Sequence, residues 1–208
     1  GLQPMESGAS IHYRSKETAE GDPGVELVGK TPLQIKRAGV SLSFVPEDRL
    51  GMGLVGSMGM TGNMLLRNYG VGHSIFVETK SAKKLAEQIL NELEVVTPSI
   101  NTPVRKLSGG NVQKVLVGRE IAAAPKVLLT AYAVRGLDIN TSYTIYNLLN
   151  EQKKRGVAVV YVGEDLDVLL ALCDRILVLA GGKISGIVDA RKTDKNEVGM
   201  MMTRMRGS

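Results

Sequence analysis

The 208-residue chain contains few of the residue types that carry covalent or metal chemistry. It has one cysteine, two histidines and no tryptophan, and aromatic residues make up 4% of it. A single cysteine, Cys173, excludes an internal disulfide, and its apolar neighbours predict a small core residue rather than a nucleophile. Neither His12 nor His73 has a cysteine or carboxylate at ligand spacing, so we expect no metal site made of them.

Long apolar runs are also lacking. No stretch approaches the roughly 18–20 consecutive apolar residues that span a bilayer, and residues 1–10 have neither a basic start nor an apolar stretch. The net charge of +5 is spread over short clusters such as Lys83-Lys84, without interleaved aromatic residues that could stack on bases. We therefore expect a cytosolic protein that does not bind nucleic acid and reaches a membrane only through a partner.

The front of the chain is polar, although a hydrophobic content of 43% is enough to bury the core of one domain. Residues 1–30 predict loops with a short hairpin near residues 10–13. Thr31-Pro32 predicts the cap and first residue of a helix that stops at Gly39, and residues 40–45 predict a strand.

The middle of the chain predicts helices. Residues 51–62 are dense in glycine and methionine, and residues 63–69 and 81–93 have helical patterns without a convincing strand among them. We expect residues 51–124 to form a helical subdomain. Its glycine- and methionine-rich stretch, residues 51–64, is either a mobile element that transmits closure to a partner or a plain flexible loop.

Beyond residue 103 helices alternate with short apolar strands, which predicts an α/β fold with a mostly parallel sheet covered on both faces. Residues 1–50 would form the front part of this core and residues 125–208 the rest. The expected helices span residues 108–124, 141–155, 166–172 and 196–204, and the expected strands span residues 127–129, 157–162, 175–180 and 183–188.

The most informative segment is Leu107-Ser108-Gly109-Gly110-Asn111-Val112-Gln113-Lys114. Two glycines after a serine cap leave backbone N–H groups uncovered where the helix dipole is positive, and the serine hydroxyl adds a donor. Anion binding is the natural use of such a segment. A simple N-capped helix explains the Ser-Gly-Gly triplet equally well.

The whole segment resembles the signature motif of the ATP-binding-cassette (ABC) ATPases. In that family the motif binds the γ-phosphate of ATP held by the other domain of a head-to-tail dimer. The segment Arg135-Gly136-Leu137-Asp138 resembles the family's D-loop, and the strands around it stand where the Walker B, switch and closing strands belong. The resemblance implies a P-loop NTPase (RecA-like) core with a helical subdomain.

A subfamily resemblance is carried by Phe44-Val45-Pro46-Glu47-Asp48-Arg49, by Gly53-Leu54-Val55 and by Thr97-Pro98-Ser99-Ile100. These segments resemble the second, C-terminal ATPase half of bacterial sugar and nucleoside importers. In that resemblance Gly1-Leu2 lies just after the Walker A helix. Residues 1–208 would then be one incomplete ABC ATPase domain, with the N-terminal strand and the phosphate loop missing in front.

Residues 24–31 match the Walker A pattern Gly-x4-Gly-Lys-Thr, but we reject them as a phosphate loop. A working loop follows a buried strand, whereas residues 16–23 are polar and end in proline. Glu26 would place a carboxylate inside a loop meant for phosphates. Thr31-Pro32 is better explained as the start of a helix.

Four positions depart from a hydrolytic site. Ala131 and Tyr132 stand where the family has an aspartate that holds Mg²⁺ and a glutamate that activates water, and neither side chain can replace them. Glu164 stands at the switch-histidine position, where its charge would repel a phosphate by roughly 4 kcal/mol at about 4 Å. Glu47 also replaces the usual Q-loop glutamine. These losses imply a catalytically degenerate site.

The resemblance implies a division of labour between two ATPase halves. Ser108, Gly109, Gly110, Asn111 and Gln113 would complete the ATP site of the partner half, which would hold most of the ATP and Mg²⁺. Asp138 would couple the two sites. The isolated chain would be inactive, and the full complex would be an ATPase coupled to transport.

The implied partners are transmembrane permease subunits and, indirectly, a solute-binding protein, which place the chain on the inner face of the cell membrane. Two rival functions stay open. One is a soluble ABC ATPase that acts on nucleic acid or ribosomes, although the coiled-coil heptads usual in DNA-acting members are missing. The other is a non-catalytic module that binds only proteins. The sequence names no particular sugar or nucleoside.

Overall fold

The computed structural model describes residues 5–15, 17–68 and 79–203. Four features expected from the sequence lie wholly or partly outside these ranges: the segment Gly1-Leu2, the helix end at Tyr69, His73 and the helix end at Arg204. Within the ranges, no helix is long and apolar enough to cross a membrane.

The front of the chain forms the predicted hairpin and short helix. Strands β1 (His12–Tyr13) and β2 (Val25–Glu26) pair antiparallel, and helix α1 (Pro32–Arg37) follows them. Thr31 caps α1 through a reciprocal capping box with Gln34. The Walker A-like pattern at residues 24–31 therefore lies on a two-residue strand, a turn and a helix cap.

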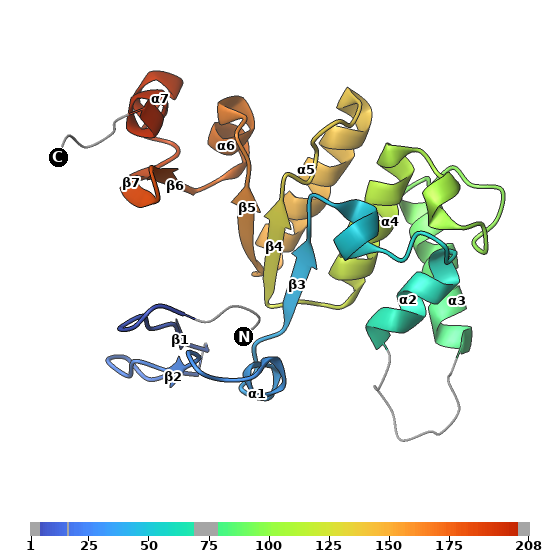
Figure 1. Ribbon diagram of the computed structural model, residues 1–208, viewed down its shortest axis with the longest axis horizontal. Coiled ribbons are helices and arrows are strands. Elements are labelled where there is room, and N and C mark those ends of the chain that lie inside the picture. Colours follow the sequence, from blue (N-terminus) through green and yellow to red (C-terminus); the bar gives the residue numbers. More distant parts are fainter. Residues whose placement is uncertain (1–4, 16, 69–78, 204–208) are drawn as a thin grey trace.

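A three-stranded parallel sheet forms the centre of the molecule (Figure 1). Its strands are β3 (Leu42–Val45), β4 (Val127–Ala131) and β5 (Ala158–Val162), in the order β3-β4-β5. Strand β4 runs two residues past the predicted end at residue 129, because Thr130 and Ala131 still pair with β5. The parallel arrangement confirms the predicted α/β class.

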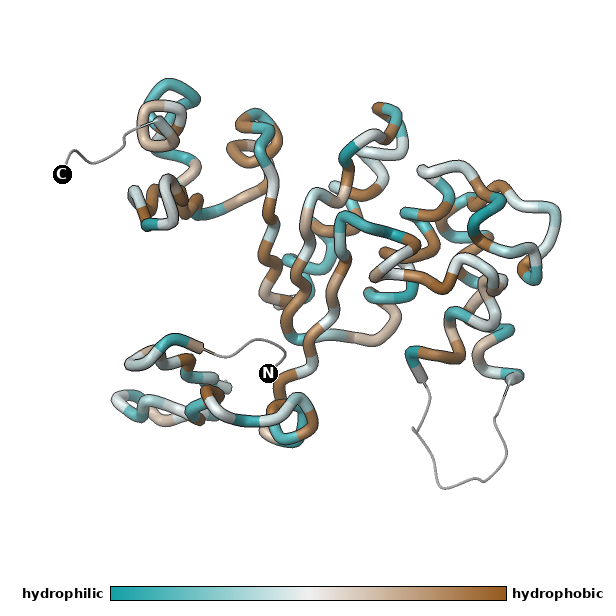
Figure 2. The backbone as a smooth tube through the Cα atoms, viewed as in Figure 1, coloured by the Kyte–Doolittle hydropathy of each residue, from teal (hydrophilic) through white to brown (hydrophobic). Residues whose placement is uncertain are grey.

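One face of this sheet is covered and the other is open. Helices α4 (Gly109–Ala122) and α5 (Ile139–Lys154) pack on β3 and β5, and the core between them and the sheet includes Val45, Leu116, Leu128 and Ile145. On the opposite face Leu42, Phe44, Val160 and Val162 are 37–50% exposed. Figure 2 shows hydrophobic residues along these strands. The prediction of two covered faces is therefore wrong for the part of the chain that the structure describes.

A second, smaller unit follows the sheet. Helix α6 (Leu166–Leu172) leads to strands β6 (Arg175–Ala180) and β7 (Lys183–Asp189), and helix α7 (Lys195–Thr203) completes the unit. Strands β6 and β7 pair antiparallel with each other and are not joined to the central sheet. They share a small core with α6 and α7, built on Ile176, Val178, Ala190 and Val198.

The middle of the chain is helical, as predicted. Helix α2 (Met60–Asn68) and helix α3 (Thr79–Glu92) pack on each other and on α4, and Met60, Met64, Ala86 and Ile89 are buried there. Helix α2 begins three residues before the expected start at Asn63. The two helices share one continuous core with the sheet, so the subdomain boundary at residues 51–124 stays a prediction.

Gly59, just before α2, has no room for a side chain. A Cβ atom there would lie 2.6 Å from the carbonyl oxygen of Ile100 and 2.7 Å from the Cα of Asn101. Since both atoms belong to the backbone, we expect Gly59→Ala to lower the free energy of unfolding by about 1–3 kcal/mol. Chemical denaturation measures the change.

Gly199 provides the matched control, because a Cβ there meets nothing within 4 Å. It lies inside α7, so Gly199→Ala should raise stability by roughly 0.5–1 kcal/mol. Equal effects of the two substitutions would contradict the close approach at Gly59.

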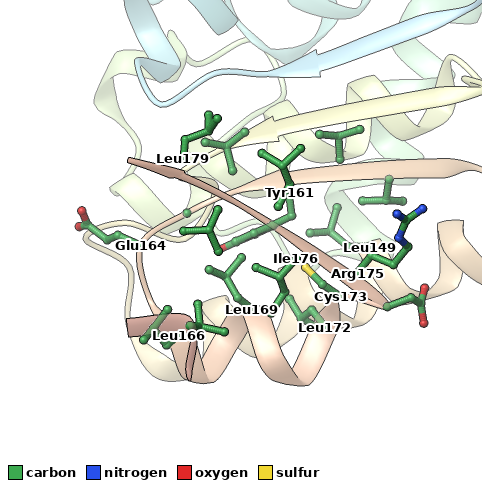
Figure 3. A pocket seen from close by; sticks show the side chains of 18 of the residues that line it. Leu149, Tyr161, Glu164, Leu166, Leu169, Leu172, Cys173, Arg175, Ile176 and Leu179 are labelled. Atoms are coloured by element: carbon green, nitrogen blue, oxygen red, sulfur yellow. The ribbon is translucent and has the colours of Figure 1, made fainter. Parts of the chain in front are cut away.

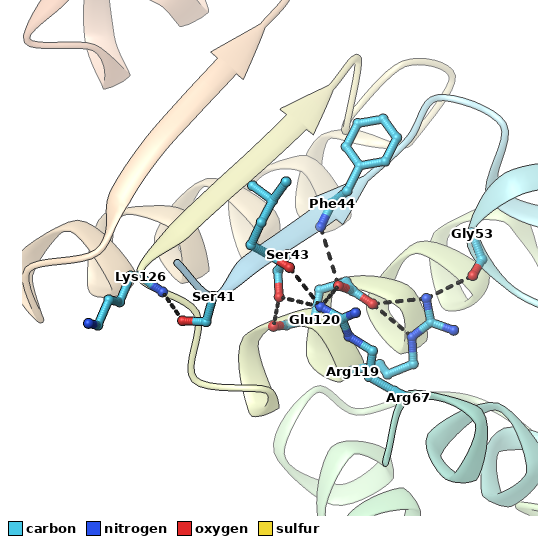
Figure 4. A network of polar contacts seen from close by, with 9 residues as sticks. Ser41, Ser43, Phe44, Gly53, Arg67, Arg119, Glu120 and Lys126 are labelled. Atoms are coloured by element: carbon cyan, nitrogen blue, oxygen red, sulfur yellow. Dashed lines mark hydrogen bonds and ion pairs between the residues drawn. The ribbon is translucent and has the colours of Figure 1, made fainter. Parts of the chain in front are cut away.

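A buried carboxylate joins β3 to the helices (Figure 4). Glu120 of α4 is 2% exposed, and its carboxylate lies 2.9 Å from a guanidinium nitrogen of Arg119 and 3.1 Å from one of Arg67. It also accepts a hydrogen bond from the backbone N–H of Phe44 in β3 at 3.3 Å. Arg119 in turn donates to the carbonyl of Gly53 at 2.7 Å. The network therefore fixes α2, α4 and the segment after β3 to one another.

Candidate functional site

The first turn of α4 is an exposed helix N-terminus. Ser108 is its N-cap, and the hydroxyl oxygen accepts hydrogen bonds from the backbone N–H and the side-chain amide of Asn111, at 3.4 and 2.9 Å. Gly109 follows without a side chain and is exposed. The first N–H groups of a helix have no partner within the helix, and together with the dipole they attract anions. The local geometry therefore suits a phosphate group.

Arg49 places a positive charge next to this turn. One of its terminal nitrogens lies 3.5 Å from where a Cβ on Gly109 would stand. Its Nε donates to the side-chain oxygen of Gln113 at 2.7 Å, and its Nη2 donates to the carbonyl of Arg135 at 2.5 Å. Partial burial lowers the pKa of the Arg49 guanidinium, and the Glu47 charge opposes that shift. A cavity of about 400 Å³ opens here, lined by Glu47, Asp48, Arg49, Leu50, Leu107, Gly109 and Val112.

Two of the predicted ligand residues are engaged within the protein. Gln113 is fully buried and contacts Arg49, and its Nε2 has no hydrogen-bond partner within the described residues. The side-chain oxygen of Asn111 accepts the N–H of Val96 at 3.0 Å. Their role in binding a nucleotide stays a prediction, and the structure gives them a direct role in holding Arg49 and the segment before α4.

Asp138 lies beside the same turn. It caps α5, accepting the backbone N–H of Thr141 at 2.9 Å and its hydroxyl at 2.7 Å. A Cβ on Gly110 would lie 3.0 Å from the Thr141 hydroxyl and 3.5 Å from the Asp138 carboxylate. The glycine thus lets the starts of α4 and α5 meet, which brings the predicted coupling residue next to the predicted phosphate-binding turn.

The hydrogen bonds from Thr141 hold the pKa of the Asp138 carboxyl below its ordinary value. A lowered folded-state pKa stabilises the protein above about pH 3.9, the ordinary pKa of aspartate, and this stability is lost as the pH falls through the folded-state value. We expect Asp138→Asn to lower the melting temperature at pH 7, and the difference from wild type to shrink in acid. Melting curves between pH 7 and pH 3 test this, with the exposed Glu17→Gln as a charge control; a constant difference would contradict it.

A second group lies at the carboxyl ends of β4 and β5, where open α/β sheets bind ligands. Ala131 ends β4, Tyr132 follows with a φ of 51°, and Glu164 comes two residues after β5. The N–H of Tyr132 donates to the carbonyl of Val162 at 2.9 Å, and Tyr132 and Glu164 line the same cavity. A tyrosine in the left-handed region is strained by about 1–3 kcal/mol, and such strain clusters at functional sites.

These residues do not fit a resident Mg²⁺ ion. Alanine and a phenol offer no carboxylate ligand, and Glu164 is the single carboxylate among these three residues. Across the described ranges no three histidine, cysteine or acidic side chains form a cluster that could hold a metal.

Arg135 joins the two groups of residues. Its guanidinium carbon lies 5.8 Å from the centre of the Tyr132 ring, and one of its nitrogens lies 2.6 Å from the Glu47 carboxylate. Its carbonyl accepts the hydrogen bond from Arg49. The sequence assigned no role to Arg49 or Arg135. The signal for Arg49 was its place in a charged segment directly after a strand.

The comparisons with curated proteins give one consistent result. The xylose import ATP-binding protein of Thermoanaerobacter pseudethanolicus is 34% identical over 202 residues, which are 95% of this chain and 40% of that protein. The galactose/methyl galactoside import ATP-binding protein of Clostridium perfringens is 32% identical over 189 residues, 88% of this chain and 36% of that protein. This chain thus spans well under half the length of these relatives. No model of a known protein family matches it.

Solved structures agree on the fold. A dimeric ATP-binding cassette in a post-hydrolysis state, bound to ADP and phosphate, superimposes with a TM-score of 0.66 over 81% of this chain and 72% of that one, at 23% identity. A nucleotide-free cassette from an ABC transporter gives 0.64 over 88% of this chain and 72% of that one, at 19% identity. The chain therefore has the ABC ATPase fold and belongs to that family, and its relatives are ATP-binding proteins of bacterial sugar importers.

Proposed function

We propose that this chain is part of the ATP-binding component of an importer for sugars or nucleosides, and that its signature segment completes the ATP site of another ATPase half. The observation that carries the proposal is the exposed first turn of α4, where Ser108 is the N-cap and Gly109 lies beside the Arg49 guanidinium. The relatives are named as xylose and galactose/methyl galactoside import ATP-binding proteins, and these names support a sugar as the solute.

The donor set of this turn fits the terminal phosphate of ATP. The hydroxyl of Ser108 and the N–H groups of Gly109 and Gly110 would donate to phosphate oxygens, and Arg49 would add positive charge. ATP supplies the phosphoanhydride bond whose hydrolysis drives transport. Because no described cluster here holds a metal, Mg²⁺ would be bound mainly by the other half.

The chain's own site would bind nucleotide weakly or without turnover. Ala131 offers no metal ligand, and Tyr132 is a poor base at neutral pH. The negative charge of Glu164 would repel the negative charge that grows on the phosphate in the transition state. Asp138 would couple this site to the complete one, since it contacts the start of α4 at Gly110.

The partners follow from the same proposal. The other ATPase half would form a head-to-tail dimer with this one, and transmembrane permease subunits would hold the pair on the inner face of the membrane. An apolar surface before α2 would contact the permease, since Leu50, Met52 and Val55 are 40%, 71% and 40% exposed. A solute-binding protein would act only indirectly, through the permease.

A chimaera tests the function. In the Thermoanaerobacter xylose-import relative, the 202 matching residues are replaced by this chain, and ATPase activity is measured. We expect ATPase activity within about tenfold of the unmodified relative, and none when the segment is deleted. A folded chimaera without ATPase activity would contradict the proposal.

A further inference from the structure

The cavity at the start of α4 has an unfavourable charge for a phosphate. Three of its lining residues are charged: Glu47 and Asp48 carry negative charges, and Arg49 carries a positive one. The lining by itself therefore carries more negative than positive charge. A phosphate placed against the exposed turn at Gly109 would meet this excess, and like charges repel.

The Glu47 carboxylate depends on Arg135 for its compensation. Asp48 is engaged locally, because its carboxylate accepts the N–H of Gly51 at 2.8 Å. Arg49 has its Nε and Nη2 in hydrogen bonds to other groups. Among the residues that the structure describes, the only ion pair of Glu47 is the one with Arg135, at 2.6 Å.

Arg135 supplies its charge from outside the cavity. It is not part of the cavity lining, and its guanidinium carbon lies 5.8 Å from the centre of the Tyr132 ring. A guanidinium stays charged at every pH that a folded protein meets, and it stacks well on aromatic faces. Arg135 therefore balances the charge of Glu47 without filling the space that a phosphate would occupy.

The other acidic residue at these strand ends is not compensated. Glu164 lies at one end of a cavity of about 810 Å³ between β5 and β6 (Figure 3). It has no ion pair within the described part of the chain. Compensation is thus present at the signature turn and missing beside the degenerate positions Ala131 and Tyr132.

We propose that Arg135 is a positioning residue that acts through Glu47: by neutralising this carboxylate, it lets the cavity beside Gly109 accept the terminal phosphate of ATP. This inference rests on the proposed function, since it concerns the same site. It assigns Arg135 no contact with ATP.

The ion pair contributes little to folding, which makes the inference testable. The side chains of Arg135 and Glu47 are 61% and 47% exposed, and such exposed pairs add little stability. Arg49 bonds to the backbone carbonyl of Arg135, which every substitution at this position retains. We expect Arg135→Met to lower the melting temperature of the isolated chain by less than about 4 °C.

The chimaera with the xylose-import relative provides the assay. Arg135→Met should raise the KM for ATP at least about tenfold and change kcat less, because the uncompensated Glu47 charge opposes phosphate binding. Adding Glu47→Gln to Arg135→Met removes both charges and should return KM to within about threefold of the unmodified chimaera. Added salt should shrink the effect of Arg135→Met, since it screens exposed charges.

The exposed pair of Glu151 and Lys154 provides the matched control, because its atoms lie 2.7 Å apart at the C-terminal end of α5. Lys154→Met should leave KM unchanged. If Arg135→Met also left KM unchanged while Ser108→Ala lowered the ATPase rate, the proposed function would stand and this inference would be wrong. A double variant as impaired as Arg135→Met would overturn it too. Unchanged ATPase activity in Ser108→Ala would overturn both.

Discussion

Replacing Ser108 by alanine in the chimaera should lower the ATPase rate about 100-fold. Ser108 gives the exposed turn of α4 both its cap and a hydroxyl that would donate to the phosphate. Removing one donor from a preorganised anion site costs about 10²–10³ in rate. The steady-state ATPase rate at saturating ATP measures this loss.

Two further variants separate chemistry from helix stability. Ser108→Thr keeps the hydroxyl and the cap and should retain most of the activity, while alanine also loses about 1 kcal/mol of cap stability. Ser57→Ala removes an exposed hydroxyl before α2 and should change nothing. Unchanged ATPase activity in Ser108→Ala would remove the signature segment from the mechanism.

Replacing Glu120 by alanine should lower the free energy of unfolding by about 3–5 kcal/mol, because removing one partner of a buried ion pair leaves charge uncompensated. The Arg119 side chain is only 10% exposed and would lose its carboxylate, as would Arg67. The N–H of Phe44 in β3 would also lose its acceptor. Urea denaturation of the isolated chain measures the change.

Glu87 provides the control on the surface. It lies 3.8 Å from Lys83 in a pair whose side chains are 52% and 63% exposed, so Glu87→Ala should cost under about 1 kcal/mol. Glu120→Gln keeps the side-chain shape and one hydrogen-bond acceptor. Its loss in free energy of unfolding should therefore lie between the losses of Glu120→Ala and Glu87→Ala. If Glu120→Ala were as mild as Glu87→Ala, the network in Figure 4 would not hold β3 to the helices.

Local patterns predicted the secondary structure well. Helix α6 and strand β6 have the predicted bounds, and both ends of α4 and of α5 lie within two residues of their own predicted bounds. Apolar periodicity and caps determine these elements locally. The sequence did not predict that β6–β7 separates from the central sheet or that one sheet face stays open. Strand pairing depends on contacts between distant residues, which a local pattern does not report.

The candidate site was predicted only in part. The segment at Ser108, Gly109 and Gly110 was recognised because capping residues and glycines have a local signal. The resemblance gave Asp138 a coupling role, and its place beside Gly110 came only from the structure. The contacts of Arg49 with Gln113 and Arg135 span 64 and 86 residues along the chain. Such contacts bury Gln113, which the sequence analysis named among the residues that would complete the partner's ATP site.

Titration of a fluorescent ATP analogue, with and without Mg²⁺, tests the central claim most directly. The account predicts no micromolar binding to the isolated chain, and binding in the chimaera that weakens with Ser108→Ala. Micromolar, Mg²⁺-dependent binding to the isolated chain would contradict it, because residues 24–31 would then form a working phosphate loop and the domain would hold nucleotide by itself.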